Sequence, residues 1–127
     1  MRVLNKEYSI NIIDGNQQLL WVLLSEYLVL APNLYQTLNT AIKEECWTDI
    51  AKAAHSLRTA LIHFDVWQLD VLVFELECAA LRLVRGDIKD ADNNELLSSA
   101  YSNTAEIINL TRILDVEIAE WLISIKG

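Results

Sequence analysis

Apolar residues recur along most of this chain at steps of three and four, the spacing of helices that bury one face. This pattern predicts one helix from Asn16 to about Glu44, one from Trp47 to Phe64, one between Asp65 and Gly86, and one from Asp92 almost to Gly127. Residues 1–13 form either a short helix or an extended cover. Because short connections favour antiparallel neighbours, we expect an all-α fold. Its form is an antiparallel up-down-up-down four-helix bundle with a short N-terminal covering segment, in a single domain spanning residues 1–127.

Capping boxes mark three of the predicted helix starts, each an Asp followed three residues later by Gln or Glu. They are Asp14 with Gln17, Asp65 with Gln68, and Asp92 with Glu95. Pro32 lacks an N–H group and predicts a kink or break in the first long helix. Gly86 has the position of a glycine that ends a helix.

The same periodicity predicts which residues face the core. In the first long helix these are Leu20, Leu23, Leu24, Tyr27, Leu28 and Leu30, and after Pro32 they are Leu34, Leu38, Ala41 and Ile42. In the third they are Leu69, Leu72, Val73, Leu76, Ala80 and Leu83, and in the last Leu97, Tyr101, Ile108, Leu114, Ile118, Trp121, Leu122 and Ile125. The last helix spans about 48 Å and the second only about 27 Å at 1.5 Å per residue. The last helix therefore overhangs its neighbours, bends, or packs on something else.

The second helix carries the most informative polar residue. Its buried stripe consists of Ile50, Ala53, Ala54, Leu57, Leu61 and Phe64. His55 lies about 100° round the helix from Ala54, so the imidazole is expected to face solvent or the rim of the stripe. Lys52 and Arg58 flank it at three residues on either side. An exposed imidazole with two nearby cations suits a phosphoryl group, although a surface histidine without a role has the same pattern.

Charge and length limit the partners of the chain. A net charge of −8 repels the phosphates of nucleic acids. The most apolar run, 19–31, is too short to cross a hydrocarbon layer of about 30 Å. Cys46 and Cys78 show no spacing typical of a disulfide or metal site. We expect a cytoplasmic protein with free thiols and no membrane segment.

The residues offer little for other catalytic chemistry. The sequence has no Gly-x-Ser-x-Gly motif and no cysteine–histidine signature of a hydrolase. His55 and His63 are the only histidines and lie about 12 Å apart along a helix, too far to share a metal ion. We therefore expect neither a metal nor a cofactor. His63 remains a rival phosphoacceptor, although a position in the last helical turn explains a histidine without chemistry.

The segment Ala54-His55-Ser56-Leu57-Arg58 resembles the Ala-His-x-Leu-Lys signature of histidine-containing phosphotransfer (HPt) domains of bacterial phosphorelays. The similarity covers roughly residues 10–88. It continues in register at Ala60, Phe64, Leu69 and the pair Leu76-Glu77, and it includes Trp47 at the start of the histidine helix. Two residues depart from the pattern, since Thr59 and Asp65 replace glycines of the family.

The resemblance implies that His55 accepts a phosphoryl group from a receiver aspartate and passes it to another, as a carrier rather than a turnover enzyme. Its partners are then a response-regulator receiver domain, a hybrid sensor kinase, or both, and magnesium comes from the receiver. Lys52 and Arg58 are the candidates to contact the phosphoryl oxygens. Ala51, Thr59 and Ile62 share the face of His55 and are the candidate docking residues.

Two alternatives stay open at this point. One is a degenerate HPt-like module that binds a kinase or receiver without carrying phosphate. The other is an unrelated helical bundle in which the motif occurs by chance. Thr59 bears on the first alternative, because a branched side chain one turn from His55 narrows the access to the imidazole.

Overall fold

The computed structural model describes residues 3–86 and 90–126, and most of these residues are helical. The helices are α1 (Lys6–Ile12), α2 (Gln17–Lys43), α3 (Trp47–Leu61), α4 (Trp67–Arg85) and α5 (Asp90–Lys126). No strand occurs in these described ranges. The prediction of an all-helical fold is therefore confirmed.

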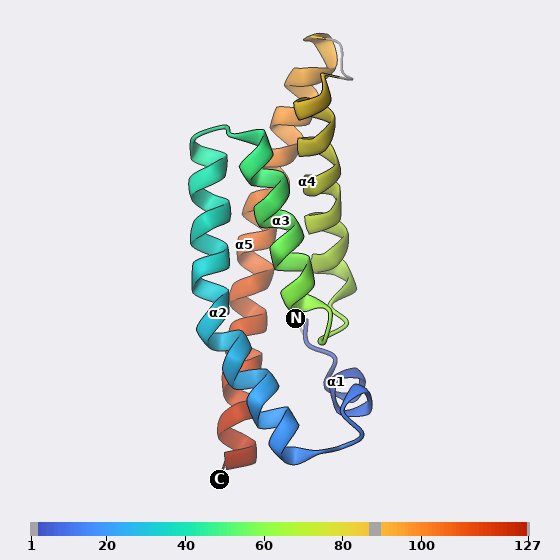
Figure 1. Ribbon diagram of the computed structural model, residues 1–127, viewed down its shortest axis with the longest axis vertical. Coiled ribbons are helices and arrows are strands. Elements are labelled where there is room, and N and C mark those ends of the chain that lie inside the picture. Colours follow the sequence, from blue (N-terminus) through green and yellow to red (C-terminus); the bar gives the residue numbers. More distant parts are fainter. Residues whose placement is uncertain (1–2, 87–89, 127) are drawn as a thin grey trace.

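Helices α2 to α5 pack side by side in chain order. Helix α3 lies against α2 and α4, and α5 lies against α4 and α2. Figure 1 shows the connection between α2 and α3 on the side where α4 and α5 extend further, and the turn between α3 and α4 towards the opposite side, next to α1. His55, near the middle of α3, is thus carried by a helix with a neighbour on either side.

The core of the molecule is formed by the apolar faces of these helices. The whole predicted stripe of α3 is buried, with Ala54 and Leu57 fully enclosed. Two predictions of inward residues are wrong, because Leu30 and Tyr101 are 48% and 43% exposed. Leu97 falls outside the residues whose side chains are described.

The buried face of α5 differs from the predicted one because it includes two threonines. It consists of Ala100, Thr104, Ile107, Leu110, Thr111, Leu114, Ile118 and Trp121. The hydroxyl of Thr104 donates to the carbonyl of Ala100 at 2.7 Å, and that of Thr111 donates to the carbonyl of Ile108 at 2.8 Å. A threonine whose hydroxyl is satisfied by its own helix can be buried without an unpaired polar group.

Helix α2 is one continuous helix that contains Pro32, as predicted. Figure 1 shows that its first half leans away from the direction of its second half. A proline inside a helix removes the hydrogen bond to the carbonyl four residues earlier and clashes with it, which bends the helix. The bend directs the first half of α2 towards α1.

The predicted capping boxes do not start the helices. Asp14 and Gly15 have left-handed backbones that end α1, and the N-cap of α2 is Asn16, whose side chain accepts from the amide of Leu19. Asp65 is also left-handed, with φ of 47°, and the N-cap of α4 is Val66. Helix α5 begins at Asp90, two residues before the predicted cap.

The ends of α3 and α4 are set by turns. Gly86 has a left-handed backbone and ends α4, as predicted. Helix α3 ends at Leu61, three residues earlier than expected, because the turn to α4 begins there and includes the left-handed Asp65. His63 therefore lies in this turn and not in the last turn of the helix.

The N-terminal segment is a short helix that covers the turn between α3 and α4. The hydroxyl of Ser9, which is fully buried, donates to the carbonyl of His63 at 2.7 Å. The backbone amides of Val3 and Leu4 donate to the carboxylate of Glu117 on α5, at 2.7 and 3.2 Å. These bonds fix α1 beside the end of the histidine helix.

Helix α5 is longer than its neighbours. Its 37 residues span about 55 Å, whereas the 15 residues of α3 span about 22 Å. In Figure 1 the ends of α4 and α5 extend beyond the connection between α2 and α3. Of the three alternatives expected for the last helix, an overhang is therefore present, since α5 continues as one helix past the connection between α2 and α3. Among the described residues, no helix combines the length and apolarity needed to span a membrane.

Candidate functional site

His55 lies on the outer face of α3, away from the core. Its side chain is 68% exposed, while its neighbour Ala54 is fully buried. The predicted exposure of the imidazole is thus confirmed. It follows from the helical phase, since a residue one step from the centre of a buried stripe points about 100° away from it.

One nitrogen of His55 is held by a carboxylate on the neighbouring helix. His55 Nδ1 lies 3.2 Å from Glu77 Oε2 of α4, and Glu77 is only 15% exposed. A carboxylate accepts hydrogen bonds and does not donate them, so Nδ1 carries the proton. In the neutral imidazole this leaves the lone pair on Nε2, the outer nitrogen, which does not contact Glu77. The pair Leu76-Glu77 thus contributes a buried leucine and the partner of the histidine.

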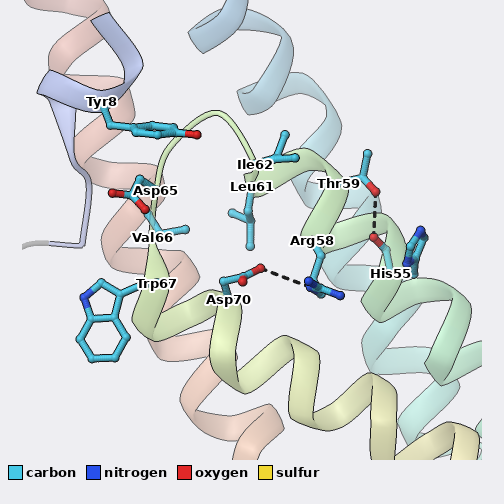
Figure 2. A pocket seen from close by; sticks show the side chains of 10 residues that line it. All are labelled: Tyr8, His55, Arg58, Thr59, Leu61, Ile62, Asp65, Val66, Trp67 and Asp70. Atoms are coloured by element: carbon cyan, nitrogen blue, oxygen red, sulfur yellow. Dashed lines mark hydrogen bonds and ion pairs between the residues drawn. The ribbon is translucent and has the colours of Figure 1, made fainter. Parts of the chain in front are cut away.

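Arg58 is the third residue of this group, and its guanidinium is bound by carboxylates and does not point freely to solvent beside the imidazole. Its Nη1 donates to Glu77 Oε1 at 3.2 Å, and its Nε donates to Asp70 Oδ1 at 3.3 Å. The guanidinium also lies 4.6 Å from the ring centre of Phe74. Figure 2 shows the Arg58 side chain directed towards Asp70, on α4. The predicted phosphate-contacting cation is therefore engaged by two carboxylates.

These contacts also affect the protonation of Arg58. Desolvation by itself lowers the pKa of the guanidinium, but the hydrogen bonds and negative charges of Glu77 and Asp70 outweigh it and raise the pKa. The side chain therefore stays positively charged at any physiological pH.

Lys52, the second predicted cation, is exposed and lies one turn before His55 on α3. It lines a depression between α2 and α3 together with Asp49 and Ser56. The structure therefore places Lys52 and Arg58 on different sides of the imidazole.

The three predicted docking residues differ in exposure. Ile62 is 63% exposed and Thr59 is also exposed, but Ala51 is 7% exposed and offers little surface to a partner. The hydroxyl of Thr59 donates to the backbone carbonyl of His55 at 3.1 Å (Figure 2). Its oxygen is thus turned to the helix backbone.

Two depressions meet at the position of His55. The first has a volume of about 390 Å³, and Figure 2 shows Tyr8 from α1 and Trp67 at the start of α4 among the residues lining it. The second, of about 530 Å³, lies between α2 and α3 and is lined by His55, Leu30 and His63 among others. Exposed apolar side chains therefore line both depressions that reach His55, and Figure 2 shows Tyr8 and Trp67 at the end of the first depression opposite the histidine.

Sequence reasoning missed Tyr8, Trp67 and the contact of Glu77. Trp67 is 67% exposed at the first position of α4. Its exposure could have been predicted, because it is out of helical phase with the buried Leu69 and Val73. Tyr8 reaches the site only because α1 folds against the turn between α3 and α4, which no local pattern encodes.

No protein-family model, curated protein or solved structure matches this chain. Among the side chains that the structure describes, no three His, Cys, Asp or Glu residues are grouped so that they could hold a metal ion.

Proposed function

We propose that this chain is a phosphorelay intermediate of the HPt type, in which His55 carries the phosphoryl group. In this proposal α2 to α5 form an antiparallel up-down-up-down four-helix bundle that holds the histidine helix. The observation that carries the proposal is the state of His55, which is exposed near the middle of α3 with Nδ1 bound to Glu77. It coincides with the sequence Ala54-His55-Ser56-Leu57-Arg58, which resembles the phosphoacceptor signature.

The chemistry requires only the lone pair of the outer nitrogen. Nε2 of His55 attacks the phosphorus of an aspartyl phosphate in line, the P–O bond breaks, and the receiver carboxylate leaves with the bonding electrons. The Nδ1 proton stays in the hydrogen bond to Glu77, whose negative charge balances the phosphoimidazolium. Transfer to a second receiver is the reverse reaction.

The surroundings of His55 supply orientation and charge. Glu77 holds the imidazole in one tautomer and one direction, which reduces the entropy lost on reaching the attacking geometry. Lys52 and Arg58 provide positive charge within one turn of His55 on α3. Magnesium, which receivers supply, is not required from this chain.

The partner in this proposal is a receiver domain or a hybrid kinase that docks around His55. Ile62, Trp67, Tyr8 and Leu30 are exposed apolar side chains next to the depressions at the histidine. Apolar side chains that line depressions leading to a polar reactive atom suit a protein partner that excludes water during transfer. The proposal places the protein in the cytoplasm, where such relays operate.

The second candidate function is a module that binds such a partner without carrying phosphate. The observation in its favour is the engagement of Arg58 by Asp70 and Glu77, because a guanidinium already paired with two carboxylates is less available to phosphoryl oxygens. Both functions use the same docking surface, and only the first requires a covalent product on His55.

The distinguishing experiment is labelling with phosphoramidate, a small donor whose P–N bond breaks to release ammonia as the Nε2–P bond forms. We expect an acid-labile phosphoryl group on the wild type and on His63→Gln, and none on His55→Gln, with the helical circular dichroism signal of all three unchanged. His63 is the matched control because it is the only other histidine and is also exposed. Label that persists in His55→Gln and disappears in His63→Gln contradicts the proposal.

A further inference from the structure

Arg58 is shared between two carboxylates of unequal roles. Glu77 binds both Arg58 and His55, whereas Asp70 binds Arg58, through Nε, on the side away from the imidazole. Asp70 is also the more accessible, at 47% exposed against 15% for Glu77. Of the two contacts, the one to Asp70 is therefore the easier to exchange with another anion.

The hydrogen-bond geometry of Arg58 indicates that one of its two carboxylate partners can be exchanged for another anion. An Arg that binds one carboxylate with both arms of its fork makes two parallel bonds of about 2.7–2.9 Å. Here the arms are divided between two residues, with bonds of 3.2 and 3.3 Å. Because the two hydrogen bonds of Arg58 are long and go to separate residues, little binding energy is lost when a phosphoryl group replaces one of the carboxylates. A phosphoryl group offers three oxygens and more negative charge.

We propose that Asp70 is a positioning residue that competes with the phosphoryl group for Arg58 and so limits phosphorylation of His55. This inference rests on the proposed function. In the unphosphorylated protein Asp70 holds the guanidinium along α4, as Figure 2 shows. Once Nε2 is phosphorylated, Arg58 leaves Asp70 and turns to the phosphoryl oxygens, one helical turn away on α3.

The competition predicts a gain from removing the carboxylate. We expect Asp70→Asn to increase the rate of His55 phosphorylation about two- to fivefold, the factor that corresponds to losing a partly exposed ion pair. Asp70→Glu keeps a carboxylate within reach of Arg58 and is expected to remain close to the wild type. A purely structural role of Asp70 does not produce this order of rates.

The test measures labelling by phosphoramidate in the full chain, with thermal unfolding confirming that each variant folds. Asp49→Asn is the matched control, because it removes one negative charge from an exposed position on α3. The inference requires that Asp70→Asn accelerates labelling, that Asp49→Asn does not, and that the gain disappears when Asp70→Asn is combined with Arg58→Gln.

The outcomes separate the inference from the function on which it rests. Equal rates for the wild type and Asp70→Asn overturn the inference and leave the proposed function intact, since label still appears on His55. A gain that persists in the Arg58→Gln background also overturns it, because Asp70 then acts by its charge alone. Absence of label from the wild type overturns the proposed function and the inference with it.

Discussion

Thr59→Gly is an informative substitution at the site, because Thr59 lies four residues after His55 on the same helix. The side chain is exposed, and its hydroxyl bonds to the carbonyl of His55. Glycine costs about 1 kcal/mol relative to alanine inside a helix and threonine up to about 0.7 kcal/mol. The bond from a threonine to the carbonyl four residues earlier adds little stability to a helix. We therefore expect Thr59→Gly to lower the free energy of unfolding by about 0.3–1 kcal/mol.

The effect on phosphorylation depends on the size of the donor. With Thr59 present the His55 side chain is already 68% exposed, so phosphoramidate reaches the imidazole without hindrance. We expect Thr59→Gly to leave labelling by phosphoramidate unchanged and to accelerate transfer from a receiver, whose surface must pack against this face. Thr59→Ala is the matched variant, since it removes the branched side chain and retains helix stability.

Thermal unfolding and the two labelling rates, measured on the same preparations, test this reasoning. Faster labelling by phosphoramidate in Thr59→Gly refutes it, because the threonine then obstructs the imidazole itself. An unchanged rate from the receiver shows that Thr59 has no part in docking.

Two further predictions concern Glu77 and Asp115. We expect Glu77→Gln, which retains an acceptor for Nδ1, to label faster with phosphoramidate than Glu77→Ala; equal rates contradict a positioning role. Burial raises the pKa of Asp115 above its ordinary value of 3.8, against hydrogen bonds from Tyr35 and Tyr27 that lower it. The folded state therefore binds the proton of Asp115 more tightly than the unfolded state does. The protonated carboxyl stabilises the fold at pH values below 3.8, and this stabilisation is lost as the pH rises through the pKa of Asp115 in the folded state. We expect the free energy of unfolding of the wild type to fall relative to Asp115→Asn over this range, measured by urea denaturation; parallel curves refute it.

The helices could largely be predicted from the sequence because their buried apolar residues recur at the three- and four-residue steps of an α-helix. The stripe of α3 is buried as its spacing predicts, and the effects of Pro32 and Gly86 are local properties of those residues. The burial of Thr104 was not predictable from apolarity, because it depends on a hydroxyl satisfied inside its own helix.

The helix starts were mispredicted because aspartate suits two conformations. An Asp before a helix acts as an N-cap or adopts a left-handed backbone, and the same sequence is compatible with both. At Asp65 the carboxylate accepts a hydrogen bond from Asn5 at 3.2 Å, a residue 60 positions away. At Asp14 the left-handed backbone continues into Gly15 and ends α1.

The exposure of His55 could be predicted from its phase, but the state of its neighbours could not. That Arg58 contacts Asp70 and Glu77 depends on how α3 and α4 face each other, which is set by the packing of both helices. Similarly, Ala51 shares the helical face of His55 in sequence but is covered in the structure.

The central claim is that His55 passes a phosphoryl group between aspartates, and a two-receiver transfer assay tests it most directly. The chain is mixed with a receiver domain from the same organism that carries a radiolabelled aspartyl phosphate, and a second receiver is then added. We predict that label moves from the first receiver to this chain in acid-labile form and then to the second receiver, with no transfer through His55→Gln. Binding of both receivers by the wild type without any label on His55 contradicts the claim and establishes the module that binds without carrying phosphate.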